Sequence, residues 1–440
     1  MSTHTSADET NAEVILPMES SSNAESAVLS SESVTDVDTL SVKALPTSFS
    51  NVGFTLPAKQ ARDAWRAVAA VKDRDDFCLF VSEDCIRFSA AANGESLDVE
   101  YKLDPSLKPR LGATQLSFDI ETKGLAALGV IDTEGDVTFK FPEIDLAVGS
   151  TGAFIITVAD AFTVNWDYVL TAATPVGQPP DERPSDVSEE GRPIDPRVLR
   201  KVISRLRDFT AEENVMGSDY TAVQVGGGAA RAGIHGAGCE IISTEIKDIS
   251  FSVERKLAGS INTLLGILAP ERTTLCSNEE RQKLTDGQMT ISVKQGEYVP
   301  ALPKLQNPVA QIRSDGFVFD EALTRIRAQI KNQKRTDDVV VEMVLSPDDQ
   351  TLTFATEVNG GVARVAANVT AGTGDLTPTS LKFFNYLFEK LDVEIQTVVE
   401  IAVFKNAVSF IQDHDKESYR TLIAPRREKQ PEAQFVQVDG

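Results

Sequence analysis

Closely spaced cysteines and catalytic motifs are missing from this chain. Its four cysteines, Cys78, Cys85, Cys239 and Cys276, form no CxxC pair. Structural zinc sites and disulfide scaffolds both depend on such spacing, so we expect free thiols, no metal site and no cofactor. No nucleophile elbow, HExxH or paired-carboxylate motif occurs either, and we predict that the protein is not an enzyme.

Long apolar runs and an excess of basic residues are missing as well. No run of about 18 apolar residues and no basic-then-apolar signal segment occurs, so we expect a soluble, cytoplasmic protein without a membrane partner. The formal net charge is −23, from 43 Lys and Arg against 66 Asp and Glu. Such a charge argues against a nucleic-acid partner unless basic residues gather on one surface.

A repeated pattern of one helix followed by strands is present instead, and it is clearest from residue 317 to 426. Apolar residues at three- and four-residue steps predict a helix over residues 319–331, and β-branched runs predict strands over 339–345, 351–355 and 361–366. The order then restarts, with a second amphipathic helix predicted at 381–388 and strands at 398–404, 407–412 and 419–426. This unit is one α+β module written twice.

The same order recurs twice upstream, so we predict six half-repeats paired into three consecutive domains of antiparallel sheet and helix. Residues 1–50 hold 18 Ser or Thr, eight acids and one lysine, which predicts a disordered acidic tail. Six prolines within residues 175–196 mark an interdomain linker. The predicted boundaries are tail 1–50, domain 51–170, linker 171–194, domain 195–306, domain 307–426 and C-terminal tail 427–440.

Basic residues concentrate on the first helix of each predicted domain. Residues 59–74, 195–208 and 321–335 each hold five Lys or Arg against one or two acids. If these helices share a surface, that surface suits a phosphate backbone without base readout; the alternative is a solvated helix face that balances local acids. The candidate DNA-facing residues are Lys59, Arg62, Arg66, Arg197, Arg200, Lys201, Arg205, Arg325 and Lys331.

Two short motifs and the six half-repeats resemble the bacterial DNA sliding clamp, the beta subunit of DNA polymerase III. The motif Tyr419-Arg420-Thr421-Leu422-Ile423-Ala424-Pro425-Arg426 is similar to the terminal strand of that family. Glu297-Tyr298-Val299-Pro300-Ala301-Leu302-Pro303-Lys304 is similar to its segment between the second and third domains. The resemblance covers roughly residues 50 to 426.

The resemblance implies a non-catalytic processivity factor for DNA replication. Two chains would form a head-to-tail homodimeric ring, with helices inside around double-stranded DNA and sheets outside. DNA polymerase and the clamp loader would bind through short peptide motifs. The alternative is a protein-interaction scaffold with the clamp fold that recruits partners without encircling DNA. Reversing the charge of the basic helix residues separates the two, because only a clamp would then lose processivity.

The family's peptide pocket lies between its second and third domains. Carried over to this chain, the resemblance implies a pocket formed by Arg231, Ala232, Ala301, Leu302, Pro303, Leu422, Ala424, Pro425 and Arg426. Ala424 stands where the family often has methionine, so we expect a wider pocket or a weaker grip. Ile423, between two of these residues, could face the pocket or complete a core strand, because alternate strand residues point to opposite faces.

Three other signals have simpler interpretations. The run from Gly226 to Arg231 lacks the GK[ST] ending of a phosphate loop and predicts a tight hairpin. Asp413-His414-Asp415 has no further metal ligand nearby and predicts a polar turn. Gln434-Phe435-Val436, in the C-terminal tail, could occupy the chain's own pocket, although a lone aromatic residue in a tail is usually inert.

Overall fold

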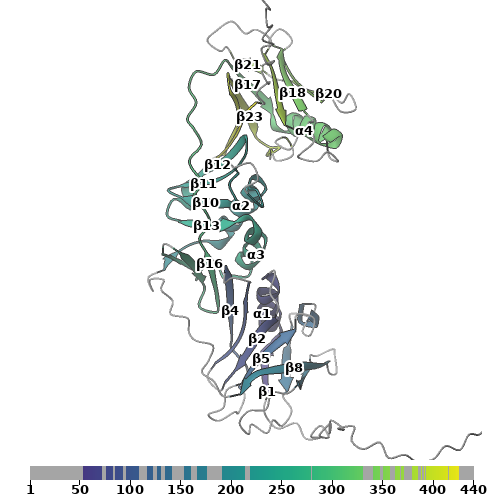
Figure 1. The fold of residues 1–440 in the computed structure, drawn as a ribbon, viewed down its shortest axis with the longest axis vertical. Helices are drawn as coiled ribbons and strands as arrows, with labels where there is room; N and C mark the ends of the chain where they lie inside the picture. Colours follow the sequence, from purple (N-terminus) through teal and green to yellow (C-terminus); the bar gives the residue numbers. More distant parts are fainter. Residues whose placement is uncertain are drawn as a thin grey trace, which may run out of the picture. The chain divides into compact units, whose positions relative to one another are not determined.

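A computed structural model describes residues within Ser48–Gly440, the second of the two units into which the chain divides (Figure 1). The described residues are 53–71, 76–82, 85–92, 96–108, 116–121, 126–129, 134–140, 153–159, 166–175, 191–213, 219–278, 280–330, 340–346, 350–356, 362–366, 368–370, 379–384, 388, 391, 393–414 and 416–425. The two predicted tails and most of the proline-rich linker therefore lie outside the described residues.

The described strands form three sheets, and neighbouring strands within each sheet pair antiparallel. The first sheet contains β1 (Gly53–Pro57), β2 (Asp76–Val81), β3 (Ile86–Ala91), β4 (Leu97–Leu103), β5 (Leu116–Glu121), β6 (Asp136–Lys140), β7 (Ala153–Ala159), β8 (Trp166–Pro175), β9 (Arg192–Pro193), β14 (Thr274–Ser277), β15 (Arg281–Thr285) and β16 (Met289–Lys294).

The second sheet contains β10 (Ala222–Gly226), β11 (Ala229–Ile234), β12 (Ala237–Ser243), β13 (Phe251–Glu254), β17 (Ala310–Asp315), β21 (Asn368–Thr370), β23 (Val398–Phe404), β24 (Ala407–His414) and β25 (Glu417–Ile423). The third contains β18 (Val340–Ser346), β19 (Thr351–Thr356), β20 (Val362–Ala366) and β22 (Thr379–Phe384). Two pairings join predicted domains: β4 with β16, and β12 with β25. The sheets therefore continue across the predicted domain boundaries.

The helices pack on the sheets through apolar faces that the sequence pattern predicts. The described helices are α1 (Ala58–Ala70), α2 (Pro196–Leu206), α3 (Arg255–Leu265), α4 (Gly316–Ile330) and the 3-10 turns η2 (Ala126–Gly129), η3 (Arg207–Phe209) and η4 (Thr244–Ile246). α1 packs on β3 and β4, α4 on β19 and β20, and α3 contacts both α1 and α2. Among the described residues, no helix is long and apolar enough to cross a membrane.

Buried side chains form two hydrophobic clusters. One joins the first and middle predicted domains through residues such as Phe54, Trp65 and Leu199, and the other lies in the third around Phe319 and Phe354. Burial of these side chains is the main stabilising term in such a fold. The α+β class predicted from the sequence is confirmed by this architecture.

The helix predicted at 381–388 is wrong over residues 381–384, and one predicted boundary shifts. Residues 379–384, assigned in part to a helix at 381–388, form β22, which pairs with β18 along its whole length. Apolar residues in 381–388 fit a helical spacing, but Thr379, Phe383 and Phe384 favour a strand, and pairing with β18 decides between the two. In addition, β8 extends to Pro175, five residues into the predicted linker.

Candidate peptide pocket and basic helix faces

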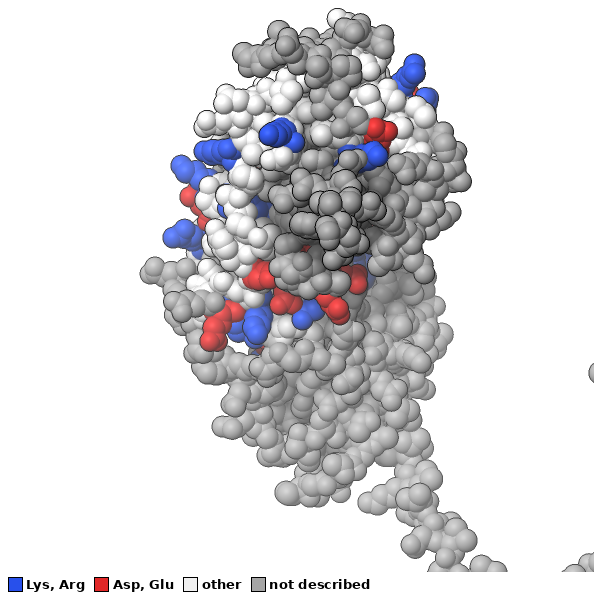
Figure 2. Space-filling model, turned by 45° about the horizontal axis from the view of Figure 1, so that its top comes forward, with Lys and Arg blue, Asp and Glu red and all other residues white. Residues whose placement is uncertain are grey.

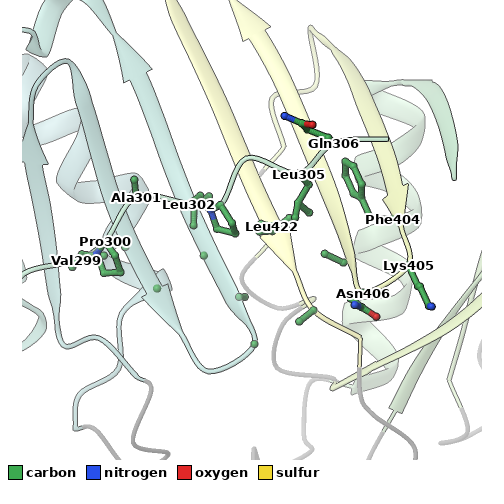
Figure 3. Close-up of a pocket in the computed structure, with 18 of the residues that line it drawn as sticks. Val299, Pro300, Ala301, Leu302, Leu305, Gln306, Phe404, Lys405, Asn406 and Leu422 are labelled. Atoms are coloured by element: carbon green, nitrogen blue, oxygen red, sulfur yellow. The ribbon is translucent and has the colours of Figure 1, made fainter. Parts of the chain in front are cut away.

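An apolar pocket of about 550 Å³ lies beside the β12–β25 strand pair (Figure 3). Residues 299–309 cross the sheet without regular secondary structure and form one side of it. The β11–β12 and β23–β24 turns and the end of β25 supply the rest. Figure 3 shows Leu302 beside Leu422 and Leu305 on the side of Phe404. The cavity is large enough for several side chains of a peptide.

Small residues on adjacent strands explain why a cavity forms at this point. The strand register places Gly233 opposite Gly238, and Gly238 opposite Leu422, so these three residues share one row. A Cβ on Gly238 would overlap the Leu302 side chain. Glycine at 238 therefore lets the crossing segment approach the sheet closely.

Six of the nine residues expected at the peptide pocket line this cavity: Ala232, Ala301, Leu302, Pro303, Leu422 and Ala424. Pro425 follows directly but does not line the cavity, and Arg426 lies outside the described residues. Ile423 is fully buried and belongs to the core of the third predicted domain, which decides between its two interpretations.

Arg231 lies next to the pocket and does not line it. Cross-strand pairing aligns Arg231 on β11, Glu240 on β12 and Arg420 on β25 in the row beside Gly233, Gly238 and Leu422. Arg231 Nε donates to Glu240 Oε1 at 2.7 Å. Two of the three residues in this row, Arg231 and Glu240, therefore form an ion pair within the sheet. This ion pair gives the apolar cavity a charged border.

Sequence reasoning missed the part of the pocket that comes from the β23–β24 turn. Phe404, Lys405 and Asn406 line the cavity although they lie about a hundred residues after the crossing segment. Their place depends on the pairing of β23 with β17 and β24, which no local pattern specifies. Only the strand register brings them to the pocket.

The basic residues of α1 are largely exposed. Lys59 and Arg66 are exposed, and Arg62 is half-buried with no hydrogen-bond partner for its Nε among the described residues. Asp63 lies among them, and burial raises the pKa of its carboxyl above the ordinary value, although Lys59, Arg66 and Arg62 oppose the shift. This face of α1 is therefore predominantly basic.

The α2 helix begins with a side-chain cap and a first-turn proline. The Asp195 side chain caps it by accepting from the Arg197 backbone N–H at 2.9 Å, and Pro196 occupies the first turn. Arg197 also pairs with Asp195 through its side chain at 3.3 Å, and Arg200 is exposed beside Gly266, just after α3. Both arginines remain accessible to solvent.

Lys201 and Arg205, also expected to face DNA, contact the third predicted domain. Glu417 of β25 accepts from Lys201 Nζ at 2.6 Å and from Arg205 Nη1 at 3.0 Å. Arg205 also pairs with Glu394 at 3.2 Å and lies over the Tyr419 ring. Its side chain is 13% exposed, whereas that of Lys201 is 55% exposed. Arg205 therefore joins two parts of the chain and is the least accessible of the α2 basic residues.

The basic residues of α4 are less concentrated. Arg325 is exposed and pairs with Glu321 one turn earlier at 2.6 Å, whereas Lys331 lies outside the described residues. In the view of Figure 2, the lysine and arginine side chains of the described residues stand in small groups among acidic and uncharged ones. They form no continuous basic area on that face.

The other signals in the sequence have structural explanations. Gly227 and Gly228 adopt φ of 61° and 79° in the turn between β10 and β11, so the predicted hairpin is confirmed. Asp413 and His414, predicted to lie in a polar turn, instead end β24, where they pair with Ser418 and Glu417 of β25. His414 Nε2 pairs with Glu394 at 2.8 Å. No group of three or more potential metal ligands occurs among the residues that the structure describes.

The fold defined by these sheets and helices is the fold of the bacterial DNA sliding clamps, as the sequence motifs indicate. Solved structures that match the chain include beta subunits of DNA polymerase III. By contrast, no protein-family model and no curated protein sequence matches the chain. The similarity to sliding clamps is therefore found by comparing structures and not by comparing sequences.

Three clamps illustrate the match. DNA polymerase III subunit beta from Pseudomonas aeruginosa aligns with a TM-score of 0.60 at 14% identity, over 86% of this chain and 100% of that one. The C. crescentus beta sliding clamp gives 0.61 at 14%, over 86% and 99%. The beta subunit from Thermotoga maritima gives 0.61 at 11%, over 86% and 100%. At such identities the likeness concerns the fold.

Proposed function

We propose that this protein is a non-catalytic DNA sliding clamp that acts in DNA replication. Two chains close head to tail into a ring, with the basic helix faces toward double-stranded DNA and the sheets outside. The ring holds DNA without reading its sequence and confers processivity on a DNA polymerase. A clamp loader and the polymerase bind the apolar pocket through short peptides.

The observation that carries this proposal is the clamp fold over 86% of the chain. The three expected domains together with the linker between the first two, residues 51–426, correspond to about that share of the chain. A topological hold on DNA needs little binding energy, because a closed ring cannot dissociate sideways. Weak contacts to phosphates then allow the ring to slide, and the net charge of −23 limits nonspecific binding elsewhere.

The DNA-facing residues that we propose are those expected from the sequence, except for Arg205. Lys59, Arg66, Arg197 and Arg200 are exposed and suit contacts with phosphates. Arg205 is better suited to joining α2 to β25, because its guanidinium has two carboxylate partners and an aromatic ring. Arg62, Lys201, Arg325 and Lys331 complete the proposed set.

The pocket supports the proposed recruitment of partners. Its lining is mostly aliphatic, with Leu302, Leu305 and Leu422 beside small residues. Short peptides that insert apolar anchors fit such a cavity, because burial of apolar surface supplies their binding energy. Ala424 is the exception to the family pattern and leaves more room at the end of β25.

A second candidate function is a clamp-fold scaffold that recruits partners without encircling DNA. The ion pairs of Lys201 and Arg205 with Glu417 favour it, since they remove positive charge from the α2 surface. The well-formed pocket is common to both candidates.

Charge reversal on exposed residues alone separates the two functions. A K59E/R66E/R200E variant leaves the Glu417 contacts intact and should abolish processive synthesis by the cognate polymerase while peptide binding persists. A matched control, E213Q, removes one exposed charge from outside the helices and should leave synthesis unchanged. Processive synthesis by the triple variant at the wild-type level would favour the scaffold.

A further inference from the structure

One hydrogen bond connects the middle of the segment that closes the pocket to the sheet. Residues 300–308, here named the strap, contain Pro300, Pro303 and Pro308, which lack the N–H donors needed for a sheet ladder. Among the described residues, the one hydrogen bond recorded to the strap comes from Arg420 Nη2, which donates to the Pro303 carbonyl at 2.9 Å. Its two ends are anchored by backbone donors: Val299 N–H donates to Gln224 Oε1 at 2.9 Å, and Val309 N–H donates to the Val403 carbonyl at 2.7 Å.

Arg420 is itself held by the sheet below. It lies on β25, two residues before the pocket residue Leu422, and so on the same face. Its Nε donates to the hydroxyl of Ser409 on β24 at 3.3 Å, and Ser409 is 1% exposed. A planar guanidinium with donors at both ends can bridge two fixed acceptors. Arg420 therefore connects the buried sheet to the strap.

The side chains of the strap depend on this connection. Leu302 and Leu305 are half-buried and form the strap side of the pocket, and Leu302 lies over Gly238. Most other strap residues are exposed, so few buried contacts oppose displacement of the segment. The opposite side, made by β12 and β25, has a complete hydrogen-bond ladder.

We propose that Arg420 is a positioning residue for the peptide pocket, because it holds the strap at the distance at which Leu302 and Leu305 meet a bound peptide. The inference rests on the proposed peptide-binding function and adds a residue outside the nine expected from the resemblance. Without the Arg420 donor, the sheet side of the pocket remains and the strap side loses its position. A bound peptide then dissociates faster, while its association with the open sheet side changes little.

The test uses the full chain and a fluorescein-labelled heptapeptide with leucine and phenylalanine anchors. Arg420→Met keeps the aliphatic stem and removes both donors, and it should weaken binding about ten-fold, mainly through the dissociation rate. Arg420→Lys should restore part of the affinity, since its ammonium can donate to the Pro303 carbonyl but lacks the planar fork that also reaches Ser409. Arg313→Met is the matched control: it removes an exposed arginine that pairs with Glu400, and it should bind as the wild type does.

Hydrogen exchange supplies a second measurement that does not need the peptide. In Arg420→Met, the amides of Val299 and Val309, which hydrogen-bond at the two ends of the strap, should exchange faster, while β24 and β25 keep their protection. Wild-type affinity in Arg420→Met, or faster exchange throughout β24 and β25, would overturn the positioning role. Failure of the wild-type protein to bind the peptide would instead overturn the proposed pocket function, and the exchange result would still report whether Arg420 holds the strap.

Discussion

Replacing Glu417 with glutamine should destabilise the contact between α2 and β25. The carboxylate accepts from Lys201 at one oxygen and from Arg205 at the other. The glutamine side chain has nearly the same shape, but it can offer an acceptor to only one of these cations and turns an N–H₂ group toward the other. E417Q therefore tests charge and hydrogen bonding without creating a cavity.

The expected loss follows from the exposure of each partner. Glu417 and Arg205 are 14% and 13% exposed, and a hydrogen bond between such charged groups contributes about 1.5–3 kcal/mol. Lys201 is 55% exposed, so its pair adds at most about 1 kcal/mol. Glu394 still neutralises part of the Arg205 charge in the variant. We expect E417Q to reduce the free energy of unfolding by about 2 kcal/mol.

Calorimetry measures this loss as a fall in Tm on the order of 2 °C. The control variant is E321Q, which removes the exposed pair with Arg325 one helical turn away and should cost less than about 0.5 kcal/mol. If E417Q melts at the same temperature as E321Q, solvent screens the Glu417 contacts and the reasoning is refuted.

Three further predictions concern the pocket and α1. G238A should displace Leu302 into the cavity and weaken binding of the apolar heptapeptide, as fluorescence anisotropy would detect; unchanged binding would contradict the steric argument. A424M should tighten the same binding about five-fold, because burial of the larger apolar side chain against the peptide contributes roughly 1 kcal/mol of binding free energy. Weaker binding would mean that the side chain blocks the pocket. Burial raises the Asp63 pKa in the folded protein, so the wild type loses stability as pH rises from the unfolded pKa of about 3.8 through the folded pKa. D63N, which cannot ionise, should therefore melt higher than the wild type at pH 7. This advantage should vanish below pH 3.8. Equal melting at pH 7 would contradict it.

Local sequence patterns predict those helices and turns that are determined by their own residues. The Asp195 cap and Pro196 mark the start of α2, and the apolar spacing of α1 identifies its buried face. The Gly227-Gly228 hairpin is equally local. In these places propensity, pattern and tertiary packing favour the same structure.

Contacts between distant residues could not be predicted in the same way. The pair between Lys201 and Glu417 spans 216 residues, so helix pattern alone made Lys201 and Arg205 look like free cations. Residues 381–388 fit a helical spacing, and only pairing with β18 makes residues 379–384 a strand. The β23–β24 turn reaches the pocket through strand register. Tertiary structure decides each of these features.

Release from DNA tests the proposed ring most directly. The full chain is loaded onto a nicked circular plasmid, freed of unbound protein by gel filtration, and the plasmid is cut once with a restriction enzyme. A ring that holds DNA topologically should remain on the uncut circle and leave the linear product through its ends. Equal retention on both forms, or equal loss from both, would contradict the account.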